Sequence, residues 1–174
     1  MDYQTIIDKF YPENNALRHI LLVHSRSVAD KALAIAGRHP ELKLDRQFIE
    51  EAAMLHDIGI VPAIQCFGSE PYICHGYIGA GMLLAEGFPR HARVCERHTG
   101  AGITRDQILV RHLPLPMRDF LPETMEEKLI CYADKFFSKT RLDHEKTLEE
   151  AEASLAKFGE EGIHRFRQWE RMFR

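Results

Sequence analysis

Histidines and aspartates are the side chains in this sequence best suited to chemistry, because both can bind a metal ion. The chain has ten histidines among 174 residues, which is well above ordinary usage. Six candidate ligands lie in or beside apolar segments: His24, His56, Asp57, His75, His98 and Asp134. Each alone has an ordinary alternative. An inward histidine is more often a hydrogen-bonded core residue, and an inward aspartate can pair with an arginine.

The segment around His24 has the spacing of one face of a long helix. Apolar residues recur around it mostly at steps of three, four and seven: Leu17, Ile20, Leu21, Val28 and Ile35. We predict a helix that begins near residue 14 or 15, where an asparagine can cap it, and that ends before Pro40. His24 falls on the apolar face and should point into the core.

The rest of the chain also predicts helices, since no stretch alternates convincingly with period two. The expected ranges are about 45–58, 89–99, 124–139, 145–158 and 160–173, and a further helix should begin near residue 75. Gly59 suits a left-handed position at the end of the first of these, and Gly76, Gly79, Ala80 and Gly81 leave the helix from 75 thin on one side. Segments 61–74, with Phe67 and Tyr72, and 113–123, with Arg118 and Asp119, predict long loops that could serve as lids or merely as connections.

Three segments together resemble the signature of the HD-domain superfamily. They are LLVHSRSVADKALAIA with His24, EAAMLHDIGI with the doublet His56–Asp57, and LICYADKFFSKTR with Asp134. Their order and helix placement agree with the signature over about residues 17–141. The resemblance implies an all-α, phosphodiesterase-like helical bundle with a metal ion held by these four residues. We expect one HD domain over residues 1–174, with helices in 142–174 packed on the motif core.

Two further histidines match the dinuclear branch of this superfamily: His75 in YICHGYIGA and His98 in CERHTGAG. The resemblance then implies that Asp57 bridges to a second metal held by these two histidines. Four imidazoles and two carboxylates favour one or two divalent transition-metal ions (Fe, Mn, Co, Ni or Zn) over magnesium. With neutral histidines, two ions and two aspartates leave a local charge of about +2, which attracts phosphate.

The activity that the resemblance implies is hydrolysis of a phosphate ester or anhydride, in a nucleotide or another small phosphorylated metabolite, by metal-activated water. Asp57 is expected in the catalytic centre. Lys135 is the first candidate for the cation that steadies the transferring group, with Arg18 and Arg141 behind it. The most similar group is the bacterial symmetrical diadenosine tetraphosphatase type, although no lysine follows Gly59 as it does in that group.

Two alternatives to hydrolysis remain at this point. The same six ligands also resemble the mixed-valent di-iron oxygenases of the superfamily, which cleave carbon bonds in inositol or organophosphonates. Oxygen uptake would favour an oxygenase, whereas phosphate release without oxygen would favour a hydrolase. A metal-stabilised binding or regulatory module is the third reading, and it is weakened because no metal ligand is missing.

Composition places the chain among globular proteins with small-molecule partners. Hydrophobic residues make up 45%, charged residues 28%, and the net charge is −3. We therefore expect a small phosphorylated substrate rather than a nucleic-acid polymer or a membrane. The first residues lack a signal-peptide pattern, so a cytoplasmic location is expected. The four cysteines form no CxxC pair and are expected to be reduced. Ile163, Phe166, Trp169 and Phe173 at helical spacing predict core or homodimer packing.

Overall fold

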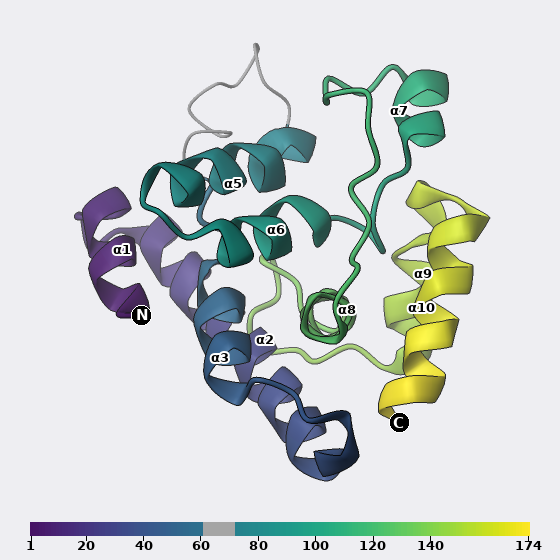
Figure 1. Ribbon diagram of the computed structural model, residues 1–174, viewed down its shortest axis with the longest axis horizontal. Coiled ribbons are helices and arrows are strands. Elements are labelled where there is room, and N and C mark those ends of the chain that lie inside the picture. Colours follow the sequence, from purple (N-terminus) through teal and green to yellow (C-terminus); the bar gives the residue numbers. More distant parts are fainter. Residues whose placement is uncertain (61–71) are drawn as a thin grey trace.

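The computed structural model describes residues 1–60 and 72–174, and this part of the chain is helical (Figure 1). Its α-helices are α1 (Tyr3–Phe10), α2 (Ala16–Arg38), α3 (Arg46–Leu55), α5 (His75–Ala85), α6 (Pro89–Arg97), α7 (Arg105–Arg111), α8 (Met125–Asp134), α9 (Leu148–Ala153) and α10 (Glu160–Phe173). Short 3-10 turns are η1 (Pro40–Leu42), η2 (Tyr72–Cys74) and η3 (Ala156–Phe158). The described residues form isolated β-bridges but no sheet, so the all-α expectation is confirmed.

Side-chain caps explain where several helices begin. Asn15 accepts a hydrogen bond from the N–H of Arg18 and caps α2, as its position in the sequence predicts. Asp45 caps α3 in the same way, and Thr124 caps α8. Three predicted ranges were wrong. The helix α3 ends at Leu55 instead of near residue 58, α8 ends at Asp134 instead of continuing to residue 139, and the range 145–158 is divided between α9 and η3.

Two of the described helices were not predicted, and both are short. In α1, Asp2 accepts hydrogen bonds from two backbone N–H groups, and Ile6 and Ile7 are buried. The helix α7 begins with a capping box between Thr104 and Gln107. Short helices carry only one or two inward residues, so their apolar period is weak in the sequence.

The core surrounds α8, which Figure 1 shows end-on near the centre, with α2, α3, α6 and α10 around it. Tyr132 of α8 stacks on Phe166 of α10 with ring centroids 5.1 Å apart, and Trp169 and Phe173 are also buried. The apolar residues of α10 thus belong to the same core as those of α2 and α8. Within the described ranges, no helix is both long and apolar enough to cross a membrane.

Glycines allow α5 to lie against α6 and the turn after α3. A Cβ atom at Gly76 would be 2.6 Å from the carbonyl oxygen of Cys95, and one at Gly59 would overlap the backbone of His75 and Gly79. Gly59 has no positive φ, so the left-handed end expected there was wrong and close packing is the reason for glycine. Gly81 faces open space.

The two expected loops are only partly described. Residues 61–71, which include Phe67, lie outside the described residues, so the lid expected at 61–74 stays a prediction. Residues 113–123 are irregular, as the prolines predict. Ion pairs hold this second loop and the start of α8 to α6: Arg118 to Glu96 at 2.7 Å and Arg93 to Glu127 at 2.8 Å.

Candidate metal centre

Six residues from separate parts of the fold converge on one buried point. They are His24 in α2, His56 and Asp57 in the turn after α3, His75 at the start of α5, His98 after α6, and Asp134 at the end of α8. None exposes more than 7% of its surface. Carboxylates removed from water need a positively charged side chain or a metal ion beside them, because desolvating an unpaired charge is costly.

Four of the donor atoms lie close together on one side, and we call them the first donor set: His24 Nε2, His56 Nε2, Asp57 Oδ2 and Asp134 Oδ1. His24 Nε2 lies 3.2 Å from Asp57 and 3.0 Å from Asp134, and His56 Nε2 lies 3.2 and 3.5 Å from the same two oxygens. Neighbouring ligands at about 2.1 Å from a metal are about 3.0–3.4 Å apart. The first donor set therefore has the spacing of ligands around one ion.

The other oxygen of Asp57 belongs to a second donor set with His75 and His98. Asp57 Oδ1 lies 3.2 Å from His75 Nε2 and 3.3 Å from His98 Nε2, and these two nitrogens are 3.0 Å apart. A carboxylate can bridge two ions through its two oxygens, which an imidazole cannot do through one nitrogen. The geometry thus fits two ions that share Asp57.

Backbone carbonyls orient three of the four imidazoles. In His56, His75 and His98, Nδ1 lies 2.6–2.7 Å from the carbonyl oxygen three residues earlier. A carbonyl only accepts, so in the neutral ring Nδ1 holds the proton and Nε2 presents a lone pair to the cluster. The lone pairs of His75 and His98 would repel each other at 3.0 Å unless a cation lies between them.

Buried atoms without aligned hydrogen bonds mark the same point. Among the described residues these include His56 Nε2 and Asp57 Oδ1. Buried polar atoms are normally satisfied, so exceptions call for an explanation such as a bound ion. The residues present therefore fit the divalent metal that the sequence predicts, and the donor set suits a transition metal.

Burial and neighbouring charges shift the pKa values of both carboxylates and of two of the histidines. Burial opposes charge on Asp57 and Asp134, yet Lys139 and Lys135 respectively, with the nearby histidines, hold the pKa of each carboxyl well below its usual range. Burial lowers the pKa of His98 to about 3. Burial opposes protonation of His56 as well, but the two aspartates raise its pKa to about 9.

Two buried thiols lie behind the histidines. The Cys95 thiol donates to the carbonyl oxygen of His56 at 2.9 Å, and the Cys131 thiol donates to that of His98 at 3.3 Å. Burial raises the pKa of Cys131 to about 12 and raises that of Cys95 as well. Both side chains stay uncharged at neutral pH and fill space behind the ligands.

Two lysines reach the carboxylates. Lys135 Nζ lies 2.7 Å from Asp134 Oδ2 and 3.0 Å from the carbonyl oxygen of His98, in the place expected from the sequence. Lys139 Nζ lies 2.7 Å from Asp57 Oδ2 and was not predicted. In a helix running to residue 139, five residues of about 100° each would have turned it about 140° away from Asp134. Because α8 ends at Asp134, the chain instead returns Lys139 to the cluster.

The two arginines proposed from the sequence are not brought to this cluster. Arg18 binds the backbone carbonyl of Tyr11 and the carboxylate of Asp8, on the side of α2 that faces α1. Arg141 is exposed in the turn that follows Ser138. Neither lines the cavity that opens beside the six residues.

A cavity of about 520 Å³, the metal-side cavity, reaches His75, His98 and Asp134. Its wall holds four lysines and one aspartate among its charged residues: Lys135, Lys139, Lys146, Lys157 and Asp134. Leu17, Phe137 and Phe158 supply part of its apolar wall. The cavity is therefore suited to an anion attached to an apolar or aromatic group.

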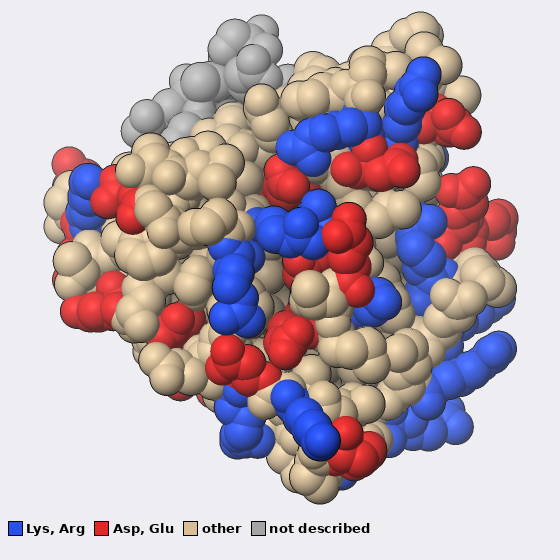
Figure 2. Space-filling view, viewed as in Figure 1, with Lys and Arg blue, Asp and Glu red and all other residues tan. Residues whose placement is uncertain are grey.

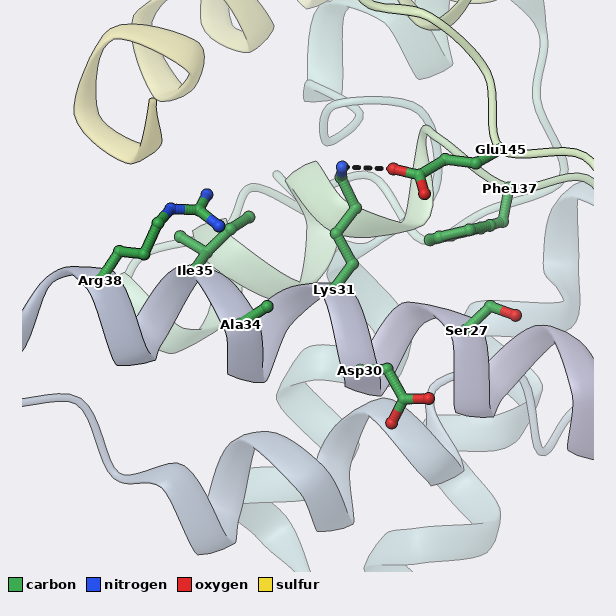
Figure 3. Close-up of a pocket in the computed structure, with 8 residues that line it drawn as sticks. All are labelled: Ser27, Asp30, Lys31, Ala34, Ile35, Arg38, Phe137 and Glu145. Atoms are coloured by element: carbon green, nitrogen blue, oxygen red, sulfur yellow. Dashed lines mark hydrogen bonds and ion pairs between the residues drawn. The ribbon is translucent and has the colours of Figure 1, made fainter.

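A second cavity of about 380 Å³, the α2 cavity, is shown in Figure 3 and contains none of the six residues. Its charged residues balance: Lys31 and Arg38 against Asp30 and Glu145. Lys31 Nζ donates a hydrogen bond to Glu145 at 2.6 Å within this cavity. Nothing in this wall offers a clustered donor set.

Comparison with known proteins gives one family and several relatives. An uncharacterized protein of Methanocaldococcus jannaschii is 35% identical over 145 residues, which cover 82% of this chain and 79% of that protein. Two tRNA (cytidine(56)-2'-O)-methyltransferases, from Picrophilus torridus and Thermoplasma volcanium, are 35% and 33% identical over 74% and 84% of this chain. The aligned regions cover only 35% and 41% of those two proteins. No solved structure matches this chain.

These relatives do not support the diadenosine tetraphosphatase type in particular. Residues 21–138 of the 174 match the HD domain, and this range includes both donor sets. The match spans more than half of the chain, and the all-α fold agrees with it. The chain belongs to the HD domain family.

Proposed function

We propose that this chain is a metal-dependent phosphohydrolase that acts on a small phosphorylated metabolite, a nucleotide included. The observation that carries the proposal is the placement of Asp57, whose two oxygens face two different pairs of donors beside a lysine-rich cavity. When bound, the metal ions would lower the pKa of a water molecule and polarise the phosphoryl oxygen.

In this proposal the protein's own residues bind and orient the phosphate. Lys139 and Lys135 donate hydrogen bonds to phosphoryl oxygens, where positive charge stabilises the transition state. The P–O bond to the leaving group breaks as water adds to phosphorus, and the leaving oxygen takes up a proton. Asp57, Asp134 and the four histidines hold the metal, whereas Arg18 and Arg141 have no catalytic role.

A small substrate fits this site better than a nucleic-acid polymer. The lysines lie inside a cavity of about 520 Å³ rather than along a surface groove. On the face in Figure 2, positive and negative side chains are intermixed instead of forming one basic field. The two methyltransferases have most of their length outside the aligned region, so we do not carry their named activity over to this chain.

Metal content and phosphate release test the proposal together. Protein purified without chelators should contain close to two transition-metal ions per chain, and His98→Ala should contain about one. His19→Ala is the matched control, because His19 is an exposed histidine on the same helix as His24. Wild type should hydrolyse part of a panel of nucleotides, diadenosine tetraphosphate and sugar phosphates, read as released phosphate or, for diadenosine tetraphosphate, as ADP.

Two results would overturn the proposal. The first is absence of bound metal after reconstitution with Mn, Fe, Co, Ni and Zn. The second is a metal-loaded protein that hydrolyses no compound of the panel. Oxygen uptake with inositol or an organophosphonate would then favour the di-iron oxygenase alternative, which shares these ligands.

A further inference from the structure

Part of the wall of the metal-side cavity, called its outer end below, is formed by residues that follow the HD domain match. That match ends at residue 138, and Lys146, Lys157 and Phe158 come after it. The N–H of Lys146 donates to the carbonyl oxygen of Phe136 at 2.8 Å, which closes the loop between them and directs Lys146 back to the cavity.

The two lysines at this outer end have no carboxylate partner among the described residues. Lys135 and Lys139 each pair with an aspartate of the metal centre at 2.7 Å. In contrast, Lys146 Nζ donates to a backbone carbonyl, that of Lys135, at 3.3 Å, and Lys157 lies 5.2 Å from the ring of Phe158. Burial lowers the pKa of Lys146, and the charges of Lys135 and Lys157 lower it further against the opposing effect of Asp134.

The short turn η3 that carries Lys157 and Phe158 is held in place from two sides. Gln107 Nε2 of α7 donates to the carbonyl oxygen of Phe158 at 2.7 Å, and Arg111 of the same helix donates to that of Lys157 at 2.5 Å. The Phe158 ring also packs on Gly100, where a Cβ atom would be 3.0 Å from it. Lys157 is thus mounted on a fixed element that packs on Gly100, two residues after the candidate ligand His98.

We infer that Lys146 and Lys157 form a second anion subsite, so that the substrate carries a further phosphate group away from the one that is hydrolysed. This inference rests on the proposed phosphohydrolase function and narrows its substrate class to bisphosphorylated compounds. Neither lysine has a carboxylate partner among the described residues, so their ammonium groups repel each other, and a second phosphate would remove that repulsion. The ring of Phe158 lies beside this subsite and can contact the group that joins the two phosphates.

Binding to metal-loaded protein tests the subsite independently of hydrolysis. Calorimetry would compare the dissociation constant of adenosine 3′,5′-bisphosphate with those of adenosine 3′-monophosphate and adenosine 5′-monophosphate. It would also compare fructose 1,6-bisphosphate with fructose 6-phosphate. Within each series the ligands differ only in the second phosphate. We expect at least one bisphosphate to bind about tenfold or more tightly than its monophosphate, and Lys146→Met and Lys157→Met each to remove about tenfold of that preference.

Lys128→Met is the matched control, since Lys128 is half-buried on α8 and lies outside the cavity. It should leave both affinities unchanged. The subsite is contradicted if neither bisphosphate binds more tightly than its monophosphate, or if the lysine variants weaken monophosphate and bisphosphate equally. Failure of the proposed hydrolysis is a separate result, because the wild-type protein would then release no phosphate whatever the binding preference.

Discussion

The two cavities of this protein contain the same kinds of side chains and differ in how their charges are paired. Both are lined by Phe137 and by lysine. In the α2 cavity, Lys31 donates to Glu145 at 2.6 Å and lies 4.0 Å from the centre of the Phe136 ring, so its charge is already balanced. In the metal-side cavity, lysines outnumber carboxylates. Excess charge of one sign in a cavity indicates a ligand of the other sign, whereas balanced charge indicates structure.

The largest effect should come from removing the shared carboxylate. Asp57→Asn should bind less than one metal ion and lower phosphate release by about 1,000-fold or more, because the side chain loses its negative charge and one of its two oxygens becomes an NH2 group that cannot bind a metal. Asp30→Asn, in the α2 cavity, should change neither, since Asp30 is exposed. Elemental analysis and phosphate release measure both variants. Equal effects of the two substitutions would remove the distinction between the cavities.

A packing change in the turn that carries His56 and Asp57 should have the next largest effect. Gly59→Ala would place a Cβ against the backbone of His75, so we expect a loss of about 2–3 kcal/mol in the free energy of unfolding. Gly81→Ala on α5 meets open space and should stabilise the protein by about 0.5–1 kcal/mol. Urea denaturation of metal-free protein measures both. A neutral Gly59→Ala would mean that α5 can move away from the turn.

Matched lysine substitutions compare the cavities directly. Lys139→Met should lower phosphate release by about 100-fold, because the substrate loses an ammonium donor beside Asp57. Lys31→Met should leave phosphate release unchanged and cost less than about 1 kcal/mol in stability, since its partner Glu145 is largely exposed. Steady-state kinetics and thermal unfolding measure the two outcomes. A large loss of activity in Lys31→Met would assign function to the α2 cavity.

The smallest effect is expected from thiol alkylation of Cys131. The reaction reports whether the buried region around this thiol, next to the His98 carbonyl, opens to solvent. An ordinary thiol reacts increasingly as pH rises through about 8.5, whereas Cys131, with its pKa raised to about 12 by burial, should remain protonated at that pH. Peptide mapping by mass spectrometry after iodoacetamide treatment at pH 8.5 should find Cys131 unmodified in folded protein and modified in urea. Rapid modification of folded protein would show that this region opens.

Much of the fold and of the metal centre could be predicted because the decisive signals are local. The apolar spacing around His24 predicted α2, and the asparagine before it predicted where α2 begins. The six candidate ligands do lie together. The end of α8 could not be predicted, because residues 135–139 have no proline or glycine to mark it. Lys139 was missed for the same reason.

The sequence by itself determined the helical class, the types of the six candidate ligands and the HD domain signature, since these depend on residue identity and on spacing within single helices. Only the tertiary structure decided which atoms of Asp57 face which histidines, and which lysines reach the cavity. Distances between residues far apart in the chain depend on how helices pack, and small residues such as Gly59 and Gly76 control that packing. The charge balance that separates the two cavities is likewise a property of the packed chain, because Lys31 and Glu145 meet only after folding.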